Sequence, residues 1–216
     1  KSNYSIAVAH CNFLLRDAAS DGDAAFFSDY CTAHELQYFE QSFKTKDYAK
    51  AKGISTQMAA RELRYQWFDT LKKAHGFTHL LSAHHLDDQL ETFLMNLERG
   101  SGLNGLSGMS ERNGLYIRPF LSLQKEEIKM FAAKNEIPFR EDESNTSNKY
   151  LRNALRNKVI PSLKVELPNL MKGLQKSLGL IEVSNQLIEK RVNDFRESIL
   201  ETKSLPFDSL NYENEV

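Results

Sequence analysis

The chain has 216 residues, of which 41% are hydrophobic and 26% are charged, enough for one full domain with a smaller appendage. Its net charge of −1 excludes a globally basic surface, so only local basic patches could bind nucleic acid. No apolar run of about 18 residues exists, so no membrane span is predicted, and no signal peptide is visible. Cys11 and Cys31 form no CxxC pair. We interpret them as buried free thiols of a cytoplasmic protein.

Short apolar segments alternate with helical patterns in the first half of the chain. Ser55 is placed to cap the second helix, and Gly76 is placed to end it. Strands are expected at 4–10, 37–43 and 77–83, and helices at 17–36, 55–75 and 86–98. This order predicts an α/β fold, in which helices cover both faces of a parallel sheet.

The composition changes after residue 99. A glycine-rich stretch at 100–109 precedes helices expected at 124–135 and 150–159, the second of them stopped by Pro161. An amphipathic helix is expected from 170 to about 200. With a boundary near Pro161–Pro168, we predict an α/β domain at 1–165 and a helical linker or second domain at 166–216.

A dense cluster of chemically active residue types lies at 82–92, between the third predicted strand and its helix. Ligands of open α/β sheets bind at this end of a strand. Aspartates there would stabilise the helix N-terminus in any case, which explains one of the two. A metallohydrolase site would need further ligands from elsewhere, because adjacent side chains point apart. We favour a nucleotide-processing site, with His84 at the strand tip and Asp88 and Glu91 on one helix face.

Two further patterns have competing interpretations. Gly100, Gly102 and Gly105 match the dinucleotide fingerprint but follow a helix, so we reject that assignment and expect a flexible loop at the edge of the site; an ordinary helix end explains Gly100 alone. Arg152 and Arg156 share a helix face, where like charges repel unless an anion such as phosphate lies opposite. The alternative is a solvated basic face.

Several blocks of residues together resemble the tRNA(Ile)-lysidine synthase family. In chain order they are His10-x-Asn12 with Arg16; Ala59-Ala60-Arg61 with Arg64-Tyr65; His84-His85-x-Asp87-Asp88 with Glu91-Thr92; Arg99-Gly-Ser-Gly-Leu103; Arg118-Pro119; Asp142-x-Ser144-Asn145; and Arg152-Asn153 with Arg156 and Pro161. The resemblance covers about residues 4–165. The order of the blocks, more than any single one, makes it specific.

The resemblance implies a Rossmann-like, adenine-nucleotide α-hydrolase-like domain of the N-type ATP pyrophosphatase kind. Such an enzyme uses ATP and Mg²⁺ to adenylate C2 of the wobble cytidine of an isoleucine tRNA. Free lysine then displaces AMP to form lysidine. The partners that the resemblance implies are isoleucine tRNA and free lysine. No association with a membrane is expected, and the formation of a homodimer is left open.

By similarity to the family, Asp88 would contact the metal or the lysine ammonium, and His84 the nucleotide. A base near Asp88 or Glu91 would deprotonate the amine. The nucleotide-binding candidates are His10, Asn12, Arg16, Arg61, Arg64 and His84. The RNA or phosphate candidates are Arg118, Asn145, Arg152, Asn153 and Arg156.

The sequence departs from the family pattern in two places. The nucleotide loop Ser-Gly-Gly-x-Asp-Ser is not found, so we expect it upstream of Lys1 and expect this part of the protein to be inactive alone. Phe13 replaces a histidine that the family often has there. The alternatives left open are a tRNA thiolation enzyme of the same class, a metal-dependent phosphohydrolase and a non-catalytic RNA-binding fragment.

Overall fold

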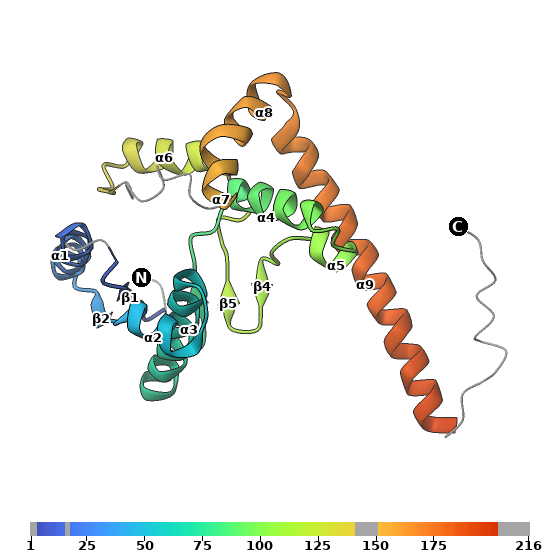
Figure 1. The fold of residues 1–216 in the computed structure, drawn as a ribbon, viewed down its shortest axis with the longest axis horizontal. Helices are drawn as coiled ribbons and strands as arrows, with labels where there is room; N and C mark the ends of the chain where they lie inside the picture. The colour runs from blue at the N-terminus through green and yellow to red at the C-terminus, as the bar shows by residue number, and fades with distance from the viewer. Residues whose placement is uncertain (1–3, 16–17, 141–150, 203–216) are drawn as a thin grey trace. The chain divides into compact units, whose positions relative to one another are not determined.

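The computed structural model describes residues 4–15, 18–140 and 151–202 (Figure 1). Its packing divides the chain into two compact units, Lys1–Leu80 and Leu81–Val216. The boundary predicted at residue 165 stays a prediction. In the part of the chain that the structure describes, no helix is both long enough and apolar enough to cross a membrane.

The first unit is built on two parallel strands. Strand β1 (Ala7–Asn12) pairs with β2 (Gln37–Ser42) in register from Ala7↔Gln37 to Asn12↔Ser42. Helix α1 (Ala18–Ala33) connects them and contacts both strands. This parallel β-α-β unit confirms the strands and the helix predicted for this region, with β1 displaced by two or three residues toward the C-terminus.

Two helices follow β2 in the first unit. Helix α3 (Thr56–His75) begins where predicted: the Ser55 side chain accepts a hydrogen bond from the Met58 N–H (3.2 Å), and Gly76 ends the helix at φ 70°. Helix α2 (Thr45–Lys52) was not predicted. Its buried residues are Thr45 and Ala49. Such small side chains give no hydrophobic periodicity that a sequence can reveal.

The second unit begins with short strands. Along the chain, strand β3 (Leu80–Leu81) at the boundary of the two units is followed by β4 (Arg112–Asn113) and β5 (Tyr116–Ile117). In the sheet that they form, β5 lies between β3 and β4. The β4–β5 pair is an antiparallel hairpin, which was not predicted because each strand has only two residues. The strand predicted at 77–83 is therefore correct in place but shorter than expected.

Helices make up most of the second unit. The predicted helices at 86–98, 124–135 and 170–200 are confirmed to within two residues. The observed elements are α4 (Leu86–Glu98), α5 (Leu103–Leu106), α6 (Lys125–Lys134), α7 (Leu151–Ala154), the π-helix η2 (Leu155–Val159), α8 (Ile160–Glu166) and α9 (Leu170–Thr202).

The prediction that Pro161 stops a helix is wrong. The chain runs from α7 through the wider turns of η2 directly into α8, and Pro161 lies in the first turn of α8. Proline has no N–H to donate, so one bond of the helical ladder is missing at this position. The π-helix just before it falls where the regular hydrogen-bond ladder is interrupted.

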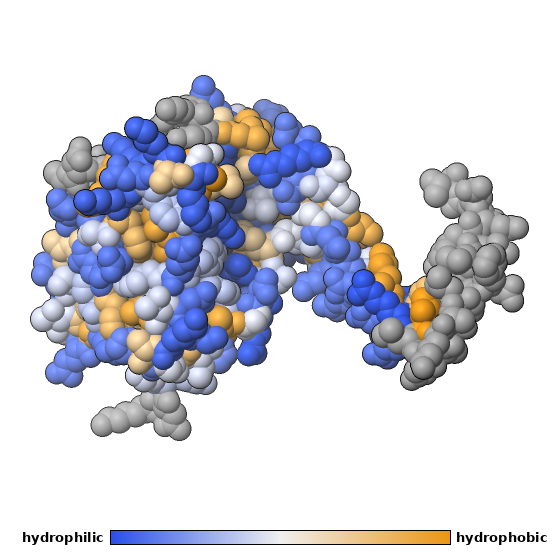
Figure 2. All heavy atoms as spheres, turned by 60° about the horizontal axis from the view of Figure 1, so that its bottom comes forward, coloured by the Kyte–Doolittle hydropathy of each residue, from blue (hydrophilic) through white to orange (hydrophobic). Residues whose placement is uncertain are grey.

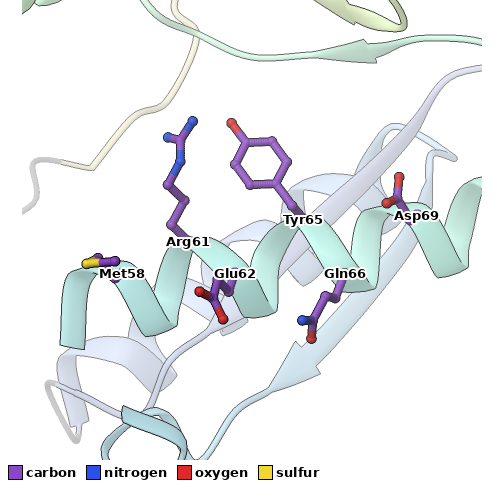
Figure 3. Close-up of a pocket in the computed structure, with 6 residues that line it drawn as sticks. All are labelled: Met58, Arg61, Glu62, Tyr65, Gln66 and Asp69. Atoms are coloured by element: carbon purple, nitrogen blue, oxygen red, sulfur yellow. The ribbon is translucent and has the colours of Figure 1, made fainter. Parts of the chain in front are cut away.

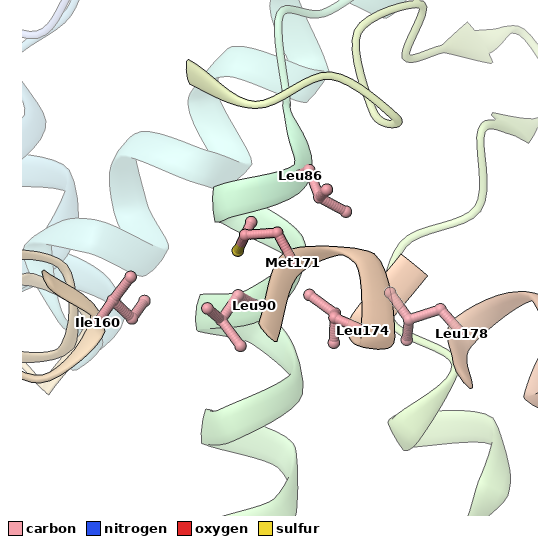
Figure 4. Close-up of a cluster of buried hydrophobic side chains, with 6 residues drawn as sticks. All are labelled: Leu86, Leu90, Ile160, Met171, Leu174 and Leu178. Carbon is pink, nitrogen blue, oxygen red and sulfur yellow. The ribbon is translucent and has the colours of Figure 1, made fainter. Parts of the chain in front are cut away.

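A single apolar cluster holds the second unit together (Figure 4). Leu86 and Leu90 of α4 pack with apolar residues at the start of α9. On each helix, the clustered residues are three or four positions apart, which places them on one face. The cluster consists of Leu86, Leu90, Ile160, Met171, Leu174 and Leu178. Farther along α9, Leu180, Val183 and Leu187 are exposed, and Figure 2 shows hydrophobic surface on this part of the helix.

Replacing Leu90 with alanine should destabilise the second unit by roughly 2–5 kcal/mol, because Leu90 is only 2% exposed and the cavity would not refill. Leu97→Ala is the matched control, since Leu97 lies on the same helix and is 54% exposed. Urea unfolding followed by far-UV circular dichroism measures both. Equal losses of stability in the two variants would contradict the assigned core.

Candidate functional site

The start of α4 is fixed by a reciprocal cap. His85 is the N-cap residue, and its Nδ1 accepts a hydrogen bond from the Asp88 N–H (3.4 Å). In return, the Asp88 carboxylate accepts the His85 N–H through Oδ2 (3.0 Å). This capping box orients Asp88 and holds its carboxylate at the helix N-terminus. The capping role of His85 was not predicted, although its place before an apolar helix and three residues ahead of Asp88 carried the signal.

A buried ion cluster joins α4 to α7 and η2. The Arg156 guanidinium donates from Nε to Glu91 Oε1 (2.5 Å) and from Nη2 to Glu91 Oε2 (2.9 Å). The same Nη2 donates to Asp88 Oδ1 (2.7 Å). The Glu91 side chain is 1% exposed, so its negative charge depends on these partners. Asp88 and Glu91, predicted to share a helix face, therefore converge on one guanidinium.

Arg152 contacts the same carboxylate from the previous turn. Its Nε lies 3.1 Å from Glu91 Oε2, and its Nη2 donates to Thr92 Oγ1 (2.9 Å). The Glu91 carboxylate thus lies opposite the two arginines, and the phosphate predicted to bind them stays a prediction. The Arg152 side chain remains 44% exposed, so part of its guanidinium still faces solvent.

The charges of this cluster are mutually stabilised. Burial alone would lower the pKa of Arg156, but the hydrogen bond and charge of Glu91, followed by the charges of Asp88 and Asp87, raise it above its ordinary value. The guanidinium is therefore a fixed positive charge. An anion could contact this guanidinium only on the parts that the carboxylates of Glu91 and Asp88 do not cover.

Asp87, next to the cluster, has a structural role. Its Oδ1 accepts from Lys164 Nζ (2.5 Å), and its Oδ2 accepts from the Lys125 N–H at the start of α6 (2.9 Å). Burial opposes ionisation of Asp87, but these hydrogen bonds and the charge of Lys164 lower its pKa. Asp87 thus ties α4 to α6 and α8.

His84 lies just before the cap and is held differently. Its Nδ1 lies 2.9 Å from Ser82 Oγ. Asp88, by contrast, contacts His85 and Arg156. A hollow beside α4 is lined by Leu86 and Gln89 among others, but not by His84 or Asp88. The predicted convergence of His84 and Asp88 on one ligand stays a prediction.

The glycine-rich segment is fastened along α4 by two amides, seven residues apart. Gln89 accepts the Met109 N–H and donates to the Met109 carbonyl, both at 2.7 Å. Asn96 donates to the Gly105 carbonyl (2.7 Å). Gly108 has φ +72°, and a Cβ there would lie 2.4 Å from Gln89 Oε1. The segment therefore includes α5 and is hydrogen-bonded to α4, and its expected flexibility at the edge of a site stays a prediction.

In the first unit, the strand-end candidates form local contacts. The ring of His10 lies 5.0 Å from that of Phe27 on α1. Asn12 is buried, and its Oδ1 accepts the Leu14 N–H (3.0 Å) in a turn that follows β1. The guanidinium of Arg64 lies over the ring of Phe13, 5.2 Å from its centroid. These contacts account for the positions of the side chains without a ligand, and their predicted nucleotide role is untested.

Arg61 lies on the exposed side of α3 (Figure 3). Its guanidinium is 4.9 Å from the centroid of the Tyr65 ring. Both residues line a shallow hollow of about 460 Å³ together with Met58, Glu62, Gln66 and Asp69. Because all six belong to one helix, the hollow is a surface groove rather than an enclosed pocket.

Of the remaining candidates, the structure describes Arg118 and Asn153 but not Arg16 or Asn145. Arg118 donates from Nη1 to the Ser110 carbonyl (2.6 Å), which fastens the segment before the β4–β5 hairpin. Asn153 follows Arg152 on α7. Arg16 and Asn145 lie outside the described residues, as does the rest of the Asp142–Asn145 block.

The described residues do not fit a protein-held metal ion. Among them, no group of three histidine, cysteine, aspartate or glutamate side chains could hold one. Both oxygens of Asp88 already accept hydrogen bonds, one from Arg156 and one from the His85 backbone. We therefore derive no chemical step through a metal bound to Asp88.

Comparisons with known proteins agree on one family. The PP-loop domain family matches residues 1–163. The chain is 37% identical over 203 residues to the tRNA(Ile)-lysidine synthase of Porphyromonas gingivalis strain W83, covering 94% of this chain and 45% of the relative. The corresponding protein of Bacillus subtilis is 36% identical, covering 93% of this chain and 43% of the relative. The chain thus spans about half the length of the curated relatives it matches.

A solved structure confirms the fold class. The chain superposes on the U34-tRNA thiolase NcsA from Methanococcus maripaludis with a TM-score of 0.61 and 17% sequence identity. The match covers 81% of this chain and 60% of that one. At this identity the likeness concerns the fold alone.

Glu91→Gln should lower the free energy of unfolding by roughly 2 kcal/mol, because two neighbouring guanidinium groups lose the charge that holds them together. The control is Glu98→Gln, an exposed residue of the same helix. Urea denaturation measures the difference between the variants. Identical midpoints would show that the ion cluster does not stabilise the fold.

Asp87 should make stability depend on pH in the acid range. Because folding lowers its pKa below 3.8, its contribution is fully present above that pH and is lost as the pH falls through the folded value. The stability difference between the native chain and Asp87→Asn should therefore shrink as the pH falls below about 4. Chemical denaturation across this range measures it, with Asp194→Asn on α9 as an exposed control. A difference that stays constant would contradict the assignment.

Proposed function

The chain belongs to the PP-loop domain family, and we propose that it is the ATP-using part of a tRNA(Ile)-lysidine synthase. The substrates would be ATP, free lysine and an isoleucine tRNA. The similarity to curated synthases along almost the whole chain carries this proposal. A location in the cytoplasm, where tRNA and free lysine are available, follows from it.

The proposed reaction has two steps. First, the oxygen on C2 of the wobble cytidine attacks the α-phosphorus of ATP, and pyrophosphate leaves. Second, the lysine ε-amine attacks C2, the C2–oxygen bond breaks, and AMP leaves with that oxygen while the amine loses a proton. Both steps develop negative charge on phosphate oxygens, which preorganised cations stabilise.

The arginines of α7 and η2 suit this task. Arg156 is fixed by Glu91 and Asp88, so its position does not have to be set when the ligand binds. Arg152 is held at one edge by Glu91 and Thr92, and the solvent-facing part of its guanidinium would bind a phosphate of ATP or tRNA.

The carboxylates would then have distinct roles. Glu91 is buried and bonded to both arginines, so we propose that it positions them rather than removing a proton from lysine. Asp88 is more exposed and contacts a single guanidinium through Oδ1. It would receive the ammonium of lysine or assist its deprotonation. His84 would contact the nucleotide.

Magnesium would enter with ATP, whose triphosphate it neutralises. The phosphate oxygens and water would supply its ligands, because both oxygens of Asp88 accept hydrogen bonds from the chain. The magnesium ion would therefore arrive and leave as part of the nucleotide substrate.

The cysteines argue against the thiolation alternative. Cys11 lies on β1 and Cys31 on α1. Burial raises the pKa of the Cys11 thiol to about 11, despite a lowering influence from Arg64, and burial also raises the pKa of Cys31. Cys11 is half-buried and Cys31 is buried. Protonated thiols are poor nucleophiles and poor metal ligands. Sulfur transfer at these two positions is therefore disfavoured.

Asp88→Ala should reduce the formation of AMP from ATP in the presence of isoleucine tRNA and lysine by at least about a hundredfold. The protein for this test is the product of the complete reading frame that contains this sequence. AMP is separated from ATP by thin-layer chromatography.

Asp194→Ala, an exposed aspartate on α9, is the control and should retain native activity. Full activity in Asp88→Ala would remove Asp88 from the mechanism. AMP formation by the native protein that does not depend on lysine or tRNA would contradict the proposed reaction.

A further inference from the structure

We propose that Thr92 is a positioning residue that determines which edge of the Arg152 guanidinium faces a phosphate group of the substrate. The inference deepens the proposed function, on which it rests, because it assigns the orientation of Arg152 to one hydroxyl group. This hydroxyl joins two helices that are distant in the chain: α4, which carries Thr92, and α7, which carries Arg152.

The hydrogen-bonding roles of the Thr92 hydroxyl follow from its two partners. Its Oγ1 lies 2.8 Å from the Asp88 carbonyl oxygen and 2.9 Å from Arg152 Nη2. A carbonyl oxygen only accepts hydrogen bonds, and a guanidinium only donates them. The hydroxyl proton is therefore donated to Asp88, and the same oxygen accepts an N–H of Arg152.

Helix α4 holds the hydroxyl oxygen in place. A threonine on a helix has few common χ1 rotamers, and the bond to the carbonyl four residues earlier selects one of them. Thr70 and Ser184 make the same kind of bond on their own helices. Among the described residues, neither of these two hydroxyls also accepts from an arginine, so the guanidinium distinguishes Thr92 from them.

Two contacts orient the guanidinium of Arg152. Its Nε lies 3.1 Å from Glu91 Oε2, and its Nη2 donates to Thr92. Because a guanidinium is planar and rigid, two contacts define the direction of its remaining N–H groups, whereas one contact leaves it free to rotate. Glu91 alone is a weaker restraint, since both of its oxygens also accept from Arg156.

The two contacts leave a defined part of the guanidinium for a ligand. Glu91 and Thr92 engage Nε and one N–H of Nη2, so the fork between Nη1 and Nη2 remains. The Arg152 side chain is 44% exposed, which gives a ligand access to this fork. Two parallel N–H groups match two oxygens of a phosphate. The phosphate belongs either to ATP or to the tRNA.

Binding measurements on the product of the complete reading frame test the inference without depending on catalysis. ATP with Mg²⁺ is titrated by calorimetry, and isoleucine tRNA is titrated by fluorescence anisotropy. Thr92→Val keeps the shape of the side chain but removes the hydroxyl, and it should weaken the binding of at least one of them by about fivefold. Thr92→Ser keeps the hydroxyl and should bind as the native protein does. The titration that weakens identifies the source of the phosphate.

Thr70→Val is the matched control, because it removes the same kind of bond from a threonine that no arginine contacts among the described residues. It should bind both ligands with native affinity. Native affinities in Thr92→Val would overturn the inference, as would an equal loss in Thr70→Val. Far-UV circular dichroism verifies that each variant is folded, and Thr92→Ala provides the same comparison if the valine variant is unstable.

A double variant tests whether Thr92 acts through Arg152. Arg152→Gln removes the guanidinium and should weaken the same titration as Thr92→Val. If the hydroxyl only orients Arg152, adding Thr92→Val to Arg152→Gln should cause no further loss. Losses that add in the double variant would overturn the positioning role.

AMP formation separates this inference from the proposed function. A native protein that binds ATP and tRNA but forms no AMP would contradict the proposed reaction, and the comparison of binding between variants would still decide the role of Thr92. Unchanged binding in Thr92→Val, together with native AMP formation, would overturn the inference and leave the reaction intact.

Discussion

The buried carboxylate of Glu91 is the constraint around which the second unit is arranged. A charge removed from water must be paired and hydrogen-bonded, otherwise its burial costs several kcal/mol. Arg156 and Arg152 meet this requirement from a different helical segment, 61 to 65 residues along the chain. The pairing therefore fixes α7 and η2 against α4. The same contact aligns the guanidinium groups, so stability and site geometry depend on one interaction.

Each face of helix α4 contacts a different part of the second unit. Leu86 and Leu90 enter the apolar cluster with α9, while Gln89 and Asn96 fasten the glycine-rich segment. Asp87 joins α6 and α8. Asp88 and Glu91 face the arginines. With 3.6 residues per turn, the side chains of α4 point in these four directions within thirteen residues.

The two arginines differ in how much of their positive charge solvent can reach. Arg156 is enclosed by two carboxylates, whereas Arg152 retains a solvent-facing part. Such a pair combines a fixed charge with an accessible one. In an adenylating enzyme, the fixed charge would contribute electrostatic preorganisation and the accessible one would bind phosphate.

The sequence by itself determined the elements that have a strong local signal. Ser55 and Gly76 delimit α3, and the apolar spacing of 86–98 and 170–200 specifies α4 and α9, because caps and periodicity act within one element. It also predicted Asp88, Glu91, Arg152 and Arg156 as candidate site residues. The cap formed by His85 and the place of Pro161 inside a helix are also local features, but they were not predicted. Only the tertiary structure decided that the charges of Asp88, Glu91, Arg152 and Arg156 neutralise one another. That outcome depends on contacts between segments distant in the chain, whose partners no local pattern specifies.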